Sequence, residues 1–403
     1  MRIPIVILIG LVLAAPLAAQ TRPRGRDLGI PFPGKTGPNN AITDVAGIAV
    51  GHVTLIEGEG KLILGKGPIR TGVTAILPRP KGNWDPVFAA TFNLNGNGDM
   101  TGINWIKESG FMEGPILLTG THSVGTVRDA AIQWQLKNGR NFIFTYPIVA
   151  ETFDFLNDAN GEHVKPMHAL QALDNAKPGR VQEGAVGGGT GMGCNGFKGG
   201  IGTSSRVLEA GGYTIGVLVQ CNYGGDLRIL GVPIRQEITD LRACTTLPQP
   251  LTREWTRGMP ACPSDRGATD TPEAQQYEGR GSIIVIVATD APLLPHQLER
   301  LTRRVGMALG RLGSWAGNSS GDLFLAFSTA NPGAGSSEGT PSLKMLPNDQ
   351  IDPLFRATID ATEEAVVNAM LAADTMTGAD GIRLFGLPGD RVIAALKKYN
   401  RMK

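Results

Sequence analysis

A segment of unusual glycine content restricts what this chain can fold into. Residues 184–202 read GAVGGGTGMGCNGFKGGIG and contain ten glycines. Glycine inside a helix or strand costs about 0.5–1 kcal/mol relative to alanine, so such a segment is a poor regular element. Glycine is favoured where the backbone turns tightly or where another element approaches too closely for a side chain. We therefore expect this segment to form a wall of backbone around a site or between two sheets.

Two glycine-rich phosphate-binding motifs offer an alternative interpretation. A P-loop requires G-x-x-x-x-G-K-[ST], but here Lys198 follows Phe197 and precedes Gly199. A dinucleotide-binding motif requires a strand before the glycines and a helix after them. The preceding residues VQEGA are a poor strand, and we expect no helix to follow. Nucleotide binding is therefore the less favoured interpretation.

The composition excludes several other classes of protein. The chain has 403 residues, 55 of them glycine, with no G-X-Y period, so it is not collagen-like. Hydrophobic residues make up 41% and charged residues 18%, which is too apolar and too weakly charged for a disordered chain. The net charge is only +2 and no basic stripe is present, so we expect no nucleic-acid partner.

The first residues predict export. Residues 1–20 place one arginine before an apolar run and then small residues, which is typical of a secretory signal peptide ending near residue 19. An uncleaved membrane anchor is the alternative. No other stretch approaches the roughly 18 apolar residues of a membrane span. We therefore expect a periplasmic protein that does not bind the membrane once the signal is removed.

The pattern of the four cysteines argues against metal binding and suggests one disulfide. They do not form a C-x-x-C motif and no histidine cluster accompanies them, so we expect no zinc site. Cys244 and Cys262 flank a segment rich in proline and threonine, and we expect them to pair. Cys194 and Cys221 lie in apolar surroundings, and we expect buried thiols there.

Hydrophobic patterns predict a mixed α/β chain in layers. Continuous apolar runs at 214–220, 282–289 and 323–327 indicate buried strands. Apolar spacings of three and four at 294–312 indicate an amphipathic helix, and a longer helix is expected at 353–373. Residues 236–281 are rich in threonine, proline, arginine and aspartate without a period, and we expect an exposed linker there.

The junction between that linker and the buried strand has a chemical implication. If the chain were cut between Gly281 and Ser282, the serine would carry a free α-amine beside its own hydroxyl. The amine can then act as general base for the hydroxyl, as in N-terminal nucleophile enzymes. A serine that merely opens a strand is the simpler interpretation, and the residues alone favour it.

Four further polar residues lie at the ends of expected strands. Ser320 and Asp322 belong to GNSSGD, before the strand at 323–327. Asn222 follows the strand at 214–220 and could donate its amide N–H to an oxyanion. Glu151 follows another expected strand and could bind a substrate ammonium. Ordinary turn chemistry, or a surface carboxylate in the case of Glu151, is the alternative.

Several segments together resemble one peptidase family. In chain order they are NAITDVAGIAVGH, NGNGDMTG, THSVGTVRDA, ETFDFLND, EGAVGGGTGMG, GFKGGIGTSSR, VLVQCNYGG, GSIIVIVATDAPLLPHQLERL and NSSGDLFLAFSTAN. They resemble the L-aminopeptidase/D-Ala-esterase (DmpA-like) family of self-processing N-terminal-serine peptidases, which includes the β-peptidyl aminopeptidases. The resemblance extends over residues 40–331.

The resemblance implies an αββα four-layer sandwich, like that of N-terminal nucleophile hydrolases but with different connectivity. It implies a precursor cut between Gly281 and Ser282, giving an α chain (20–281) and a β chain (282–403) that form one catalytic domain. It further implies tetramers of αβ units and no metal or cofactor.

The same resemblance implies roles for individual residues. Ser282 matches the nucleophile, Ser320 the second catalytic serine, and Asp322 the acidic residue that orients the amine. Asn222 matches the oxyanion donor, and Glu151 matches the residue that receives the substrate's amino group. Phe153 stands where many members have tyrosine, so the ring remains but its hydroxyl is absent.

We therefore expect an exported, self-cleaving serine aminopeptidase acting on small peptides or amino-acid amides. The N-terminal residue removed would be a β-, D-α- or L-α-amino acid. Two alternatives remain, namely a periplasmic binding protein that is never cut and an acyltransferase resembling ornithine acetyltransferase. The latter uses a threonine nucleophile in the cytoplasm, whereas this chain has Ser282 and an expected signal peptide.

Overall fold

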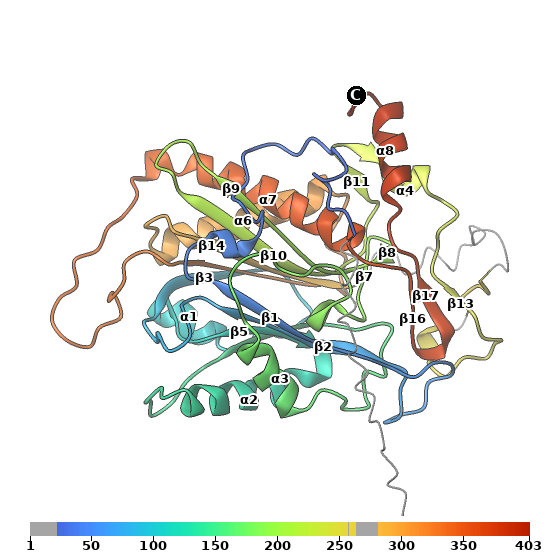
Figure 1. Ribbon diagram of the computed structural model, residues 1–403, viewed down its shortest axis with the longest axis horizontal. Coiled ribbons are helices and arrows are strands. Elements are labelled where there is room, and N and C mark those ends of the chain that lie inside the picture. Colours follow the sequence, from blue (N-terminus) through green and yellow to red (C-terminus); the bar gives the residue numbers. More distant parts are fainter. Residues whose placement is uncertain (1–21, 257, 263–280) are drawn as a thin grey trace, which may run out of the picture.

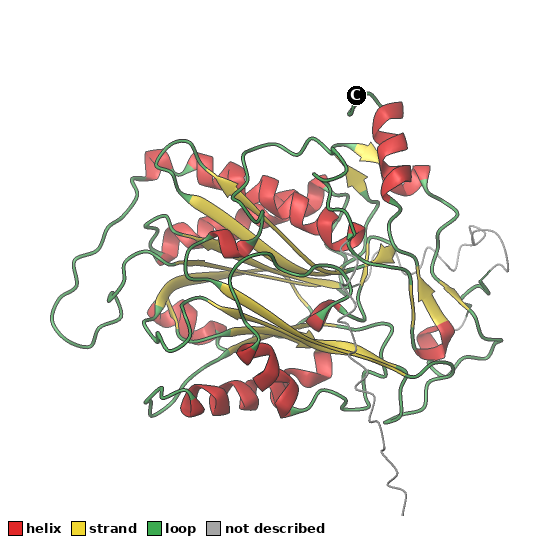
Figure 2. Cartoon of the chain, viewed as in Figure 1, coloured by secondary structure: helices red, strands yellow, loops and turns green. Residues whose placement is uncertain are grey.

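Two β-sheets stack face to face, and helices cover both outer faces (Figures 1 and 2). The structure, a computed structural model, describes residues 22–256, 258–262 and 281–403. The expected signal peptide lies outside these residues. The arrangement is the αββα sandwich that the sequence analysis predicts.

The larger sheet has six strands and carries the central strand pair. Its order is β4 (Phe111–Met112), β3 (Val87–Gly96), β15 (Gly321–Ser328), β14 (Ser282–Thr289), β10 (Thr214–Asn222) and β9 (Gly200–Val207). The strands β14 and β15 run parallel, whereas all other neighbours are antiparallel. Because β14 and β15 are parallel neighbours, both strands begin at the same end of the sheet.

The smaller sheet has four strands. Its order is β1 (Ala49–Glu57), β2 (Ile69–Leu77), β5 (Ile116–Gly120) and β6 (Ile148–Thr152). The pair β5 and β6 is parallel, and the other pairs are antiparallel.

Two helices cover each outer face. The helices α6 (Pro295–Arg311) and α7 (Asp352–Leu371) pack on the six-stranded sheet, as Figure 1 shows. The helices α2 (Val124–Lys137) and α3 (Pro166–Asp174) pack on the four-stranded sheet. The expected helices at 294–312 and 353–373 are therefore confirmed with ends shifted by one or two residues. The other helices of the described chain are α1 (Ile103–Ser109), α4 (Ile234–Glu237) and α8 (Gly389–Lys398), with 3-10 turns η1 (Ile42–Asp44), η2 (Thr121–Ser123), η4 (Glu254–Thr256), η5 (Asn348–Gln350) and η6 (Ala379–Gly381).

The continuous apolar run of β14 is explained by burial on both faces. Ile283, Val285 and Val287 belong to the core beneath α6 and α7, whereas Ile284 and Ile286 belong to the core between the sheets. Side chains alternate between the faces of a strand. Ser282 therefore lies on the same inter-sheet face as Ile284, at the end of the sheet where β14 begins.

The glycine-rich segment is inserted between the two sheets. Its 3-10 turn η3 (Gly187–Gly189) packs so closely that a Cβ on Gly188 would lie 2.2 Å from Gln220 Oε1 and 2.6 Å from the Leu118 carbonyl oxygen. This confirms the expected wall of backbone between sheets. The segment continues into the two-stranded hairpin of β7 (Gly193–Cys194) and β8 (Phe197–Lys198) and ends in β9, a strand the sequence analysis did not predict.

A Gly188→Ala substitution tests this packing. We expect the free energy of unfolding to fall by about 1–3 kcal/mol, because the added methyl group has no space. Urea denaturation of Gly188→Ala and Gly125→Ala measures the difference. Gly125 lies in α2, and a methyl group added there would meet no atom within 4 Å, so its variant should be at least as stable as the wild type. Equal stability of the two variants would contradict the packing argument.

The prediction that residues 236–281 form an exposed linker is wrong for the first half of that range. The strand β13 (Cys244–Thr245) pairs with β17 (Ile382–Leu384), which also pairs with β16 (Met376–Thr377). Leu251 and Met259 are buried against this small sheet. The apolar residues here are too sparse to produce a period, so only the fold reveals their burial. Residues 263–280 lie outside the described chain.

The other short strands are β11 (Arg228–Ile229) and β12 (Val232–Pro233).

All four cysteines form disulfides. Cys244 pairs with Cys262, the pair singled out in the sequence. Cys194 pairs with Cys221, which corrects the expectation of buried thiols. Both residues are buried as expected, but the hairpin of β7 and β8 brings Cys194 beside the end of β10. A contact between residues 27 positions apart is not visible in local sequence.

Candidate active site

Ser282 lies at the start of β14, between the ends of two neighbouring strands. The strand register places Asn222 of β10 on one side and Gly321 of β15 on the other. The Gly321 N–H donates a hydrogen bond to Ser282 Oγ at 3.0 Å. This hydrogen bond fixes the hydroxyl oxygen at the end of the sheet where β14 and β15 begin.

The residue before Ser282 can only be glycine in this conformation. Gly281 has φ +123°, and a Cβ there would lie 1.9 Å from the carbonyl oxygen of Asn222. Both the backbone angle and the lack of space exclude a side chain. The peptide bond between Gly281 and Ser282 is thus held against the end of β10.

Ser320 and Asp322 form a buried pair at the start of β15. Ser320 Oγ donates a hydrogen bond to Asp322 Oδ1 at 2.6 Å, and Asp322 pairs in register with Ile283. Burial raises the pKa of Asp322, and the hydrogen bonds from Ser320 and the Ile283 backbone partly oppose this rise. Asp322 Oδ2 is buried and has no hydrogen-bond partner among the described residues.

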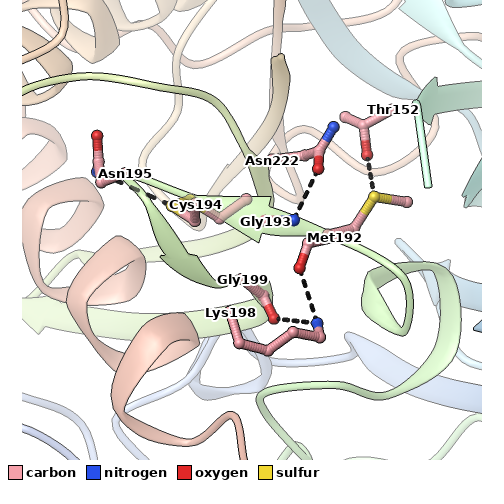
Figure 3. The surroundings of a disulfide bond; sticks show 9 residues. Thr152, Met192, Gly193, Cys194, Asn195, Lys198, Gly199 and Asn222 are labelled. Atoms are coloured by element: carbon pink, nitrogen blue, oxygen red, sulfur yellow. Dashed lines mark hydrogen bonds between the residues drawn. A yellow bond between two sulfur atoms is a disulfide. The ribbon is translucent and has the colours of Figure 1, made fainter. Parts of the chain in front are cut away.

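The Asn222 amide has a defined orientation. Its Oδ1 accepts a hydrogen bond from the Gly193 N–H at 2.9 Å, as Figure 3 shows, and its Nδ2 donates to the carbonyl oxygen of Phe153 at 2.9 Å. A primary amide has two N–H donors, so one remains for another acceptor. The side chain is completely buried.

Glu151 is a buried carboxylate at the end of β6. Its Oε1 accepts a hydrogen bond from the Asp99 N–H at 2.9 Å, and its Oε2 accepts one from the Thr121 hydroxyl. No cationic side chain bonds to it within the described chain. Burial raises its pKa, and the hydrogen bonds from Thr121 and Asp99 oppose the rise.

These residues converge although they come from distant segments. The Phe153 carbonyl bonds to Asn222, which is in register with Ser282. A Cβ on Gly98 would lie 3.3 Å from Glu151 Oε1 and 3.4 Å from the Gly321 Cα, so Gly98 lies between these two groups. The structure thus brings together all the residues singled out as catalytic or substrate-binding.

Phe153 contributes its backbone to the site. Its carbonyl oxygen fixes Asn222, and its ring makes an edge-to-face contact with Phe155 at 5.3 Å between centroids. The absent tyrosine hydroxyl therefore removes a polar group without removing the ring packing.

Sequence reasoning did not identify the partners that orient these side chains. Gly193, Thr121 and the Asp99 backbone lie in segments that carry the family resemblance, but nothing in their residue types marks them. Lys198 was also missed as a structural residue. It is fully buried, its Nζ donates to the carbonyl oxygens of Met192 and Gly199, and burial lowers its pKa to about 7.

Neither a metal cluster nor a membrane-spanning helix occurs in the part of the chain that the structure describes. Within residues 22–256, 258–262 and 281–403, no three histidine, cysteine or acidic residues are placed to hold a metal ion. Over the same ranges, no helix combines the length and hydrophobicity needed to cross a membrane.

Four layers with a serine opening a central strand are characteristic of the N-terminal nucleophile class of hydrolases. Residues 40–384 match the model of peptidase family S58, and the chain belongs to this family. It is accordingly a hydrolase of the aminopeptidase type.

Relatives and solved structures agree with this assignment. The chain is 50% identical to the β-peptidyl aminopeptidase BapA of Sphingosinicella microcystinivorans, over 98% of this chain and 97% of the relative. It is 45% identical to BapA of Sphingosinicella xenopeptidilytica, over 96% and 94%. The structure of the L-aminopeptidase D-Ala-esterase/amidase from Ochrobactrum anthropi, described as a variant of the Ntn hydrolase fold, superposes with a TM-score of 0.82 at 42% identity, covering 95% of this chain and all of that one. A β-aminopeptidase from Burkholderia sp. superposes with a TM-score of 0.78 at 43% identity, covering 93% and 98%.

Proposed function

We propose that this aminopeptidase cuts itself between Gly281 and Ser282, and that the exposed Ser282 then removes N-terminal residues from small peptides and amides. The position of Ser282 carries the proposal. It lies at the start of a central strand with Asn222 opposite it in register, its hydroxyl accepts a hydrogen bond from the Gly321 N–H, and only glycine can precede it. A serine that merely opens a strand does not require these neighbours.

Self-cleavage would begin with attack of Ser282 Oγ on the carbonyl carbon of Gly281. The new C–O bond gives a tetrahedral intermediate, and the C–N bond breaks as this intermediate collapses and the serine proton is transferred to the freed α-amine. Water then hydrolyses the ester and releases the Gly281 carboxylate. The product is an N-terminal serine with its amine beside its hydroxyl.

The mature enzyme would use that amine as general base. It takes the Ser282 proton during attack on the substrate carbonyl and returns it to the leaving amine, leaving an acyl-enzyme that water hydrolyses. Asp322 Oδ2 supports this role because a buried acceptor without a partner among the described residues suits the new ammonium or amine. Ser320 holds the other oxygen of the same carboxylate.

Two groups would determine where the substrate sits. Asn222 and backbone N–H groups would donate to the tetrahedral oxyanion. Glu151 would pair with the substrate ammonium, since its partners are neutral donors that leave its charge uncompensated. A carboxylate that binds the free N-terminus explains aminopeptidase rather than endopeptidase action. β-, D-α- and L-α-amino acids are all proposed as the residue removed, and no metal or cofactor is required.

A Glu151→Gln substitution tests the ammonium site. We expect kcat/KM to fall by about 10–100-fold near neutral pH, because a hydrogen bond to a charged group contributes about 1.5–3 kcal/mol. Burial raises the pKa of Glu151, so its carboxylate takes up a proton at a higher pH than an ordinary glutamate. The ratio of wild-type to variant kcat/KM should therefore shrink toward one as the pH falls through that raised pKa.

The Ser282 amine titrates in both enzymes, so its effect on kcat/KM cancels when the ratio is taken at each pH. Glu209→Gln, at an exposed carboxylate, serves as the control and should match the wild type at every pH. A ratio that stays constant with pH would contradict the ionic role of Glu151.

We further propose that the protein is exported to the periplasm by residues 1–19 and assembles as tetramers of αβ units. Assays with β-alanyl, L-alanyl and D-alanyl p-nitroanilides, combined with N-terminal sequencing of the purified protein, test the function. A smaller chain beginning at Ser282 and release of nitroaniline are expected. A permanently uncut chain would favour a binding protein, and acyl transfer without hydrolysis would favour an acyltransferase.

A further inference from the structure

The disulfide between Cys194 and Cys221 lies directly beside the Asn222 amide. Cys221 precedes Asn222 in β10, and Cys194 follows Gly193, the residue whose N–H bonds to Asn222 Oδ1. Both half-cystines are fully buried, with their Cα atoms 5.6 Å apart. The disulfide therefore links the sequence neighbours of the two residues that share this hydrogen bond (Figure 3).

That hydrogen bond determines which way the amide points. An amide oxygen can only accept and an amide nitrogen only donate. Rotating the Asn222 amide by 180° would place Nδ2 against the Gly193 N–H and Oδ1 against the Phe153 carbonyl, which leaves both groups without partners in a buried site. Gly193 and the Phe153 carbonyl therefore fix the orientation together, and a displaced Gly193 removes one of the two contacts.

Besides the disulfide, the hairpin that carries Gly193 is anchored at its second strand by Phe197, which is fully buried in the core that also contains Cys221. The strands β7 and β8 form a separate two-stranded sheet rather than extending either main sheet. The Asn195 N–H donates to the Tyr223 carbonyl at 2.7 Å. The Lys198 Nζ donates to the carbonyl oxygens of Met192 and Gly199, which belong to the same glycine-rich segment. Gly193 itself has no side chain that could hold its strand against β10, so on that strand the neighbouring Cys194 provides the attachment.

We propose that the Cys194–Cys221 disulfide is a positioning device that holds Gly193, and through it the Asn222 amide, in the geometry needed to receive the oxyanion. The inference rests on the proposed function, because it takes Asn222 as an oxyanion donor. The oxyanion exists only in the tetrahedral state, so a loosened donor lowers kcat and leaves KM nearly unchanged. Small displacements of catalytic groups lower rates by up to about 10²-fold, and we expect about a 10-fold loss here.

The test compares two disulfides of the same chain. Cys194→Ala/Cys221→Ala removes the crosslink at the site, and Cys244→Ala/Cys262→Ala removes the crosslink in the small sheet. Rates are normalised to the fraction of chains cut before Ser282. We expect a roughly 10-fold lower kcat with unchanged KM in the first variant and wild-type kcat in the second. Full kcat in the first variant would overturn the proposal.

A double-mutant cycle shows whether the disulfide acts through Asn222. Adding Asn222→Ala to Cys194→Ala/Cys221→Ala should lower kcat no further than Asn222→Ala alone, because the amide to be positioned is gone. Losses that multiply would overturn the proposal, since the crosslink would then act elsewhere. Wild-type kcat in Asn222→Ala alone would instead contradict the proposed function of that residue.

A reduction experiment covers the case in which the cysteine variant does not fold. Mature Cys244→Ala/Cys262→Ala protein is treated with tris(2-carboxyethyl)phosphine, which leaves the reagent only Cys194–Cys221 to cut. The disulfide gains two electrons and two protons, and the phosphine is oxidised to its oxide with oxygen from water. We expect kcat to fall as two thiols appear and to recover on reoxidation. Full activity after two thiols appear would overturn the proposal.

Discussion

Replacing Ser282 by alanine should leave the chain in one piece and without measurable aminopeptidase activity. The side chain would be both the attacking group in self-cleavage and the nucleophile of the mature enzyme, so its loss removes two successive steps. Loss of a nucleophile in enzymes of this kind costs about 10⁴-fold or more in kcat. The fold should be retained, because the substitution removes only the hydrogen bond that this hydroxyl accepts from the Gly321 N–H within the described chain.

Gel electrophoresis after purification, followed by N-terminal sequencing, measures the effect. Ser319→Ala is a matched control, because Ser319 is an exposed serine close to Ser320. It should be cut and should be fully active. If Ser282→Ala were still cut at the same bond, Ser282 would not be the nucleophile of self-cleavage.

Replacing Asn222 by alanine should lower kcat by about 10²–10³-fold. Removal of one oxyanion donor has an effect of this size in hydrolases. KM should change little, because the donor meets its charged acceptor only in the tetrahedral state. Self-cleavage should slow as well, since it passes through a similar oxyanion at Gly281.

Kinetics with a p-nitroanilide substrate and the half-time of chain cutting measure the two effects. Asn97→Ala is a suitable control, because Asn97 Nδ2 donates to the Ser319 carbonyl at the surface near the site. Its kcat should remain within about threefold of the wild type. A similarly small change in Asn222→Ala would show that other groups bind the oxyanion.

The layers of the fold were largely predictable because burial leaves a pattern in sequence. The run at 282–289 is apolar throughout since both faces of β14 are covered, and α6 shows the helical spacing of a one-sided core contact. The strand β9 escaped prediction because two of its first three residues are glycines, which carry no hydrophobic signal. Its position depends on close packing against α7, where a Cβ on Gly202 would lie 2.0 Å from the Ala365 carbonyl.

The candidate site was predictable only through the family resemblance. On local grounds Ser282 was a strand-opening serine, and Asn222 and Ser320 were turn residues. Their meeting depends on strand order and register, which local sequence does not encode. Gly193 shows the same limit, since its contribution is a backbone N–H that any residue type could provide.

The segment before Ser282, expected to be an exposed linker, shows long-range packing that composition cannot reveal. Arg253 donates hydrogen bonds to the carbonyl oxygens of Phe155 and Asn157 and pairs with Asp380. These contacts hold in place the backbone of the loop that follows Glu151. Desolvation lowers the pKa of Arg253, and the charge of Asp380 opposes that effect.

The order of strands in the larger sheet has a consequence for the fate of a cut chain. The strands β15 and β14 lie in its middle, between β3 on one side and β10 on the other. A cut before Ser282 therefore yields two polypeptides whose strands are interleaved within one sheet. Neither can leave without breaking two rows of backbone hydrogen bonds and exposing the core. Dilution should not separate them, and the two chains should unfold as a single cooperative unit.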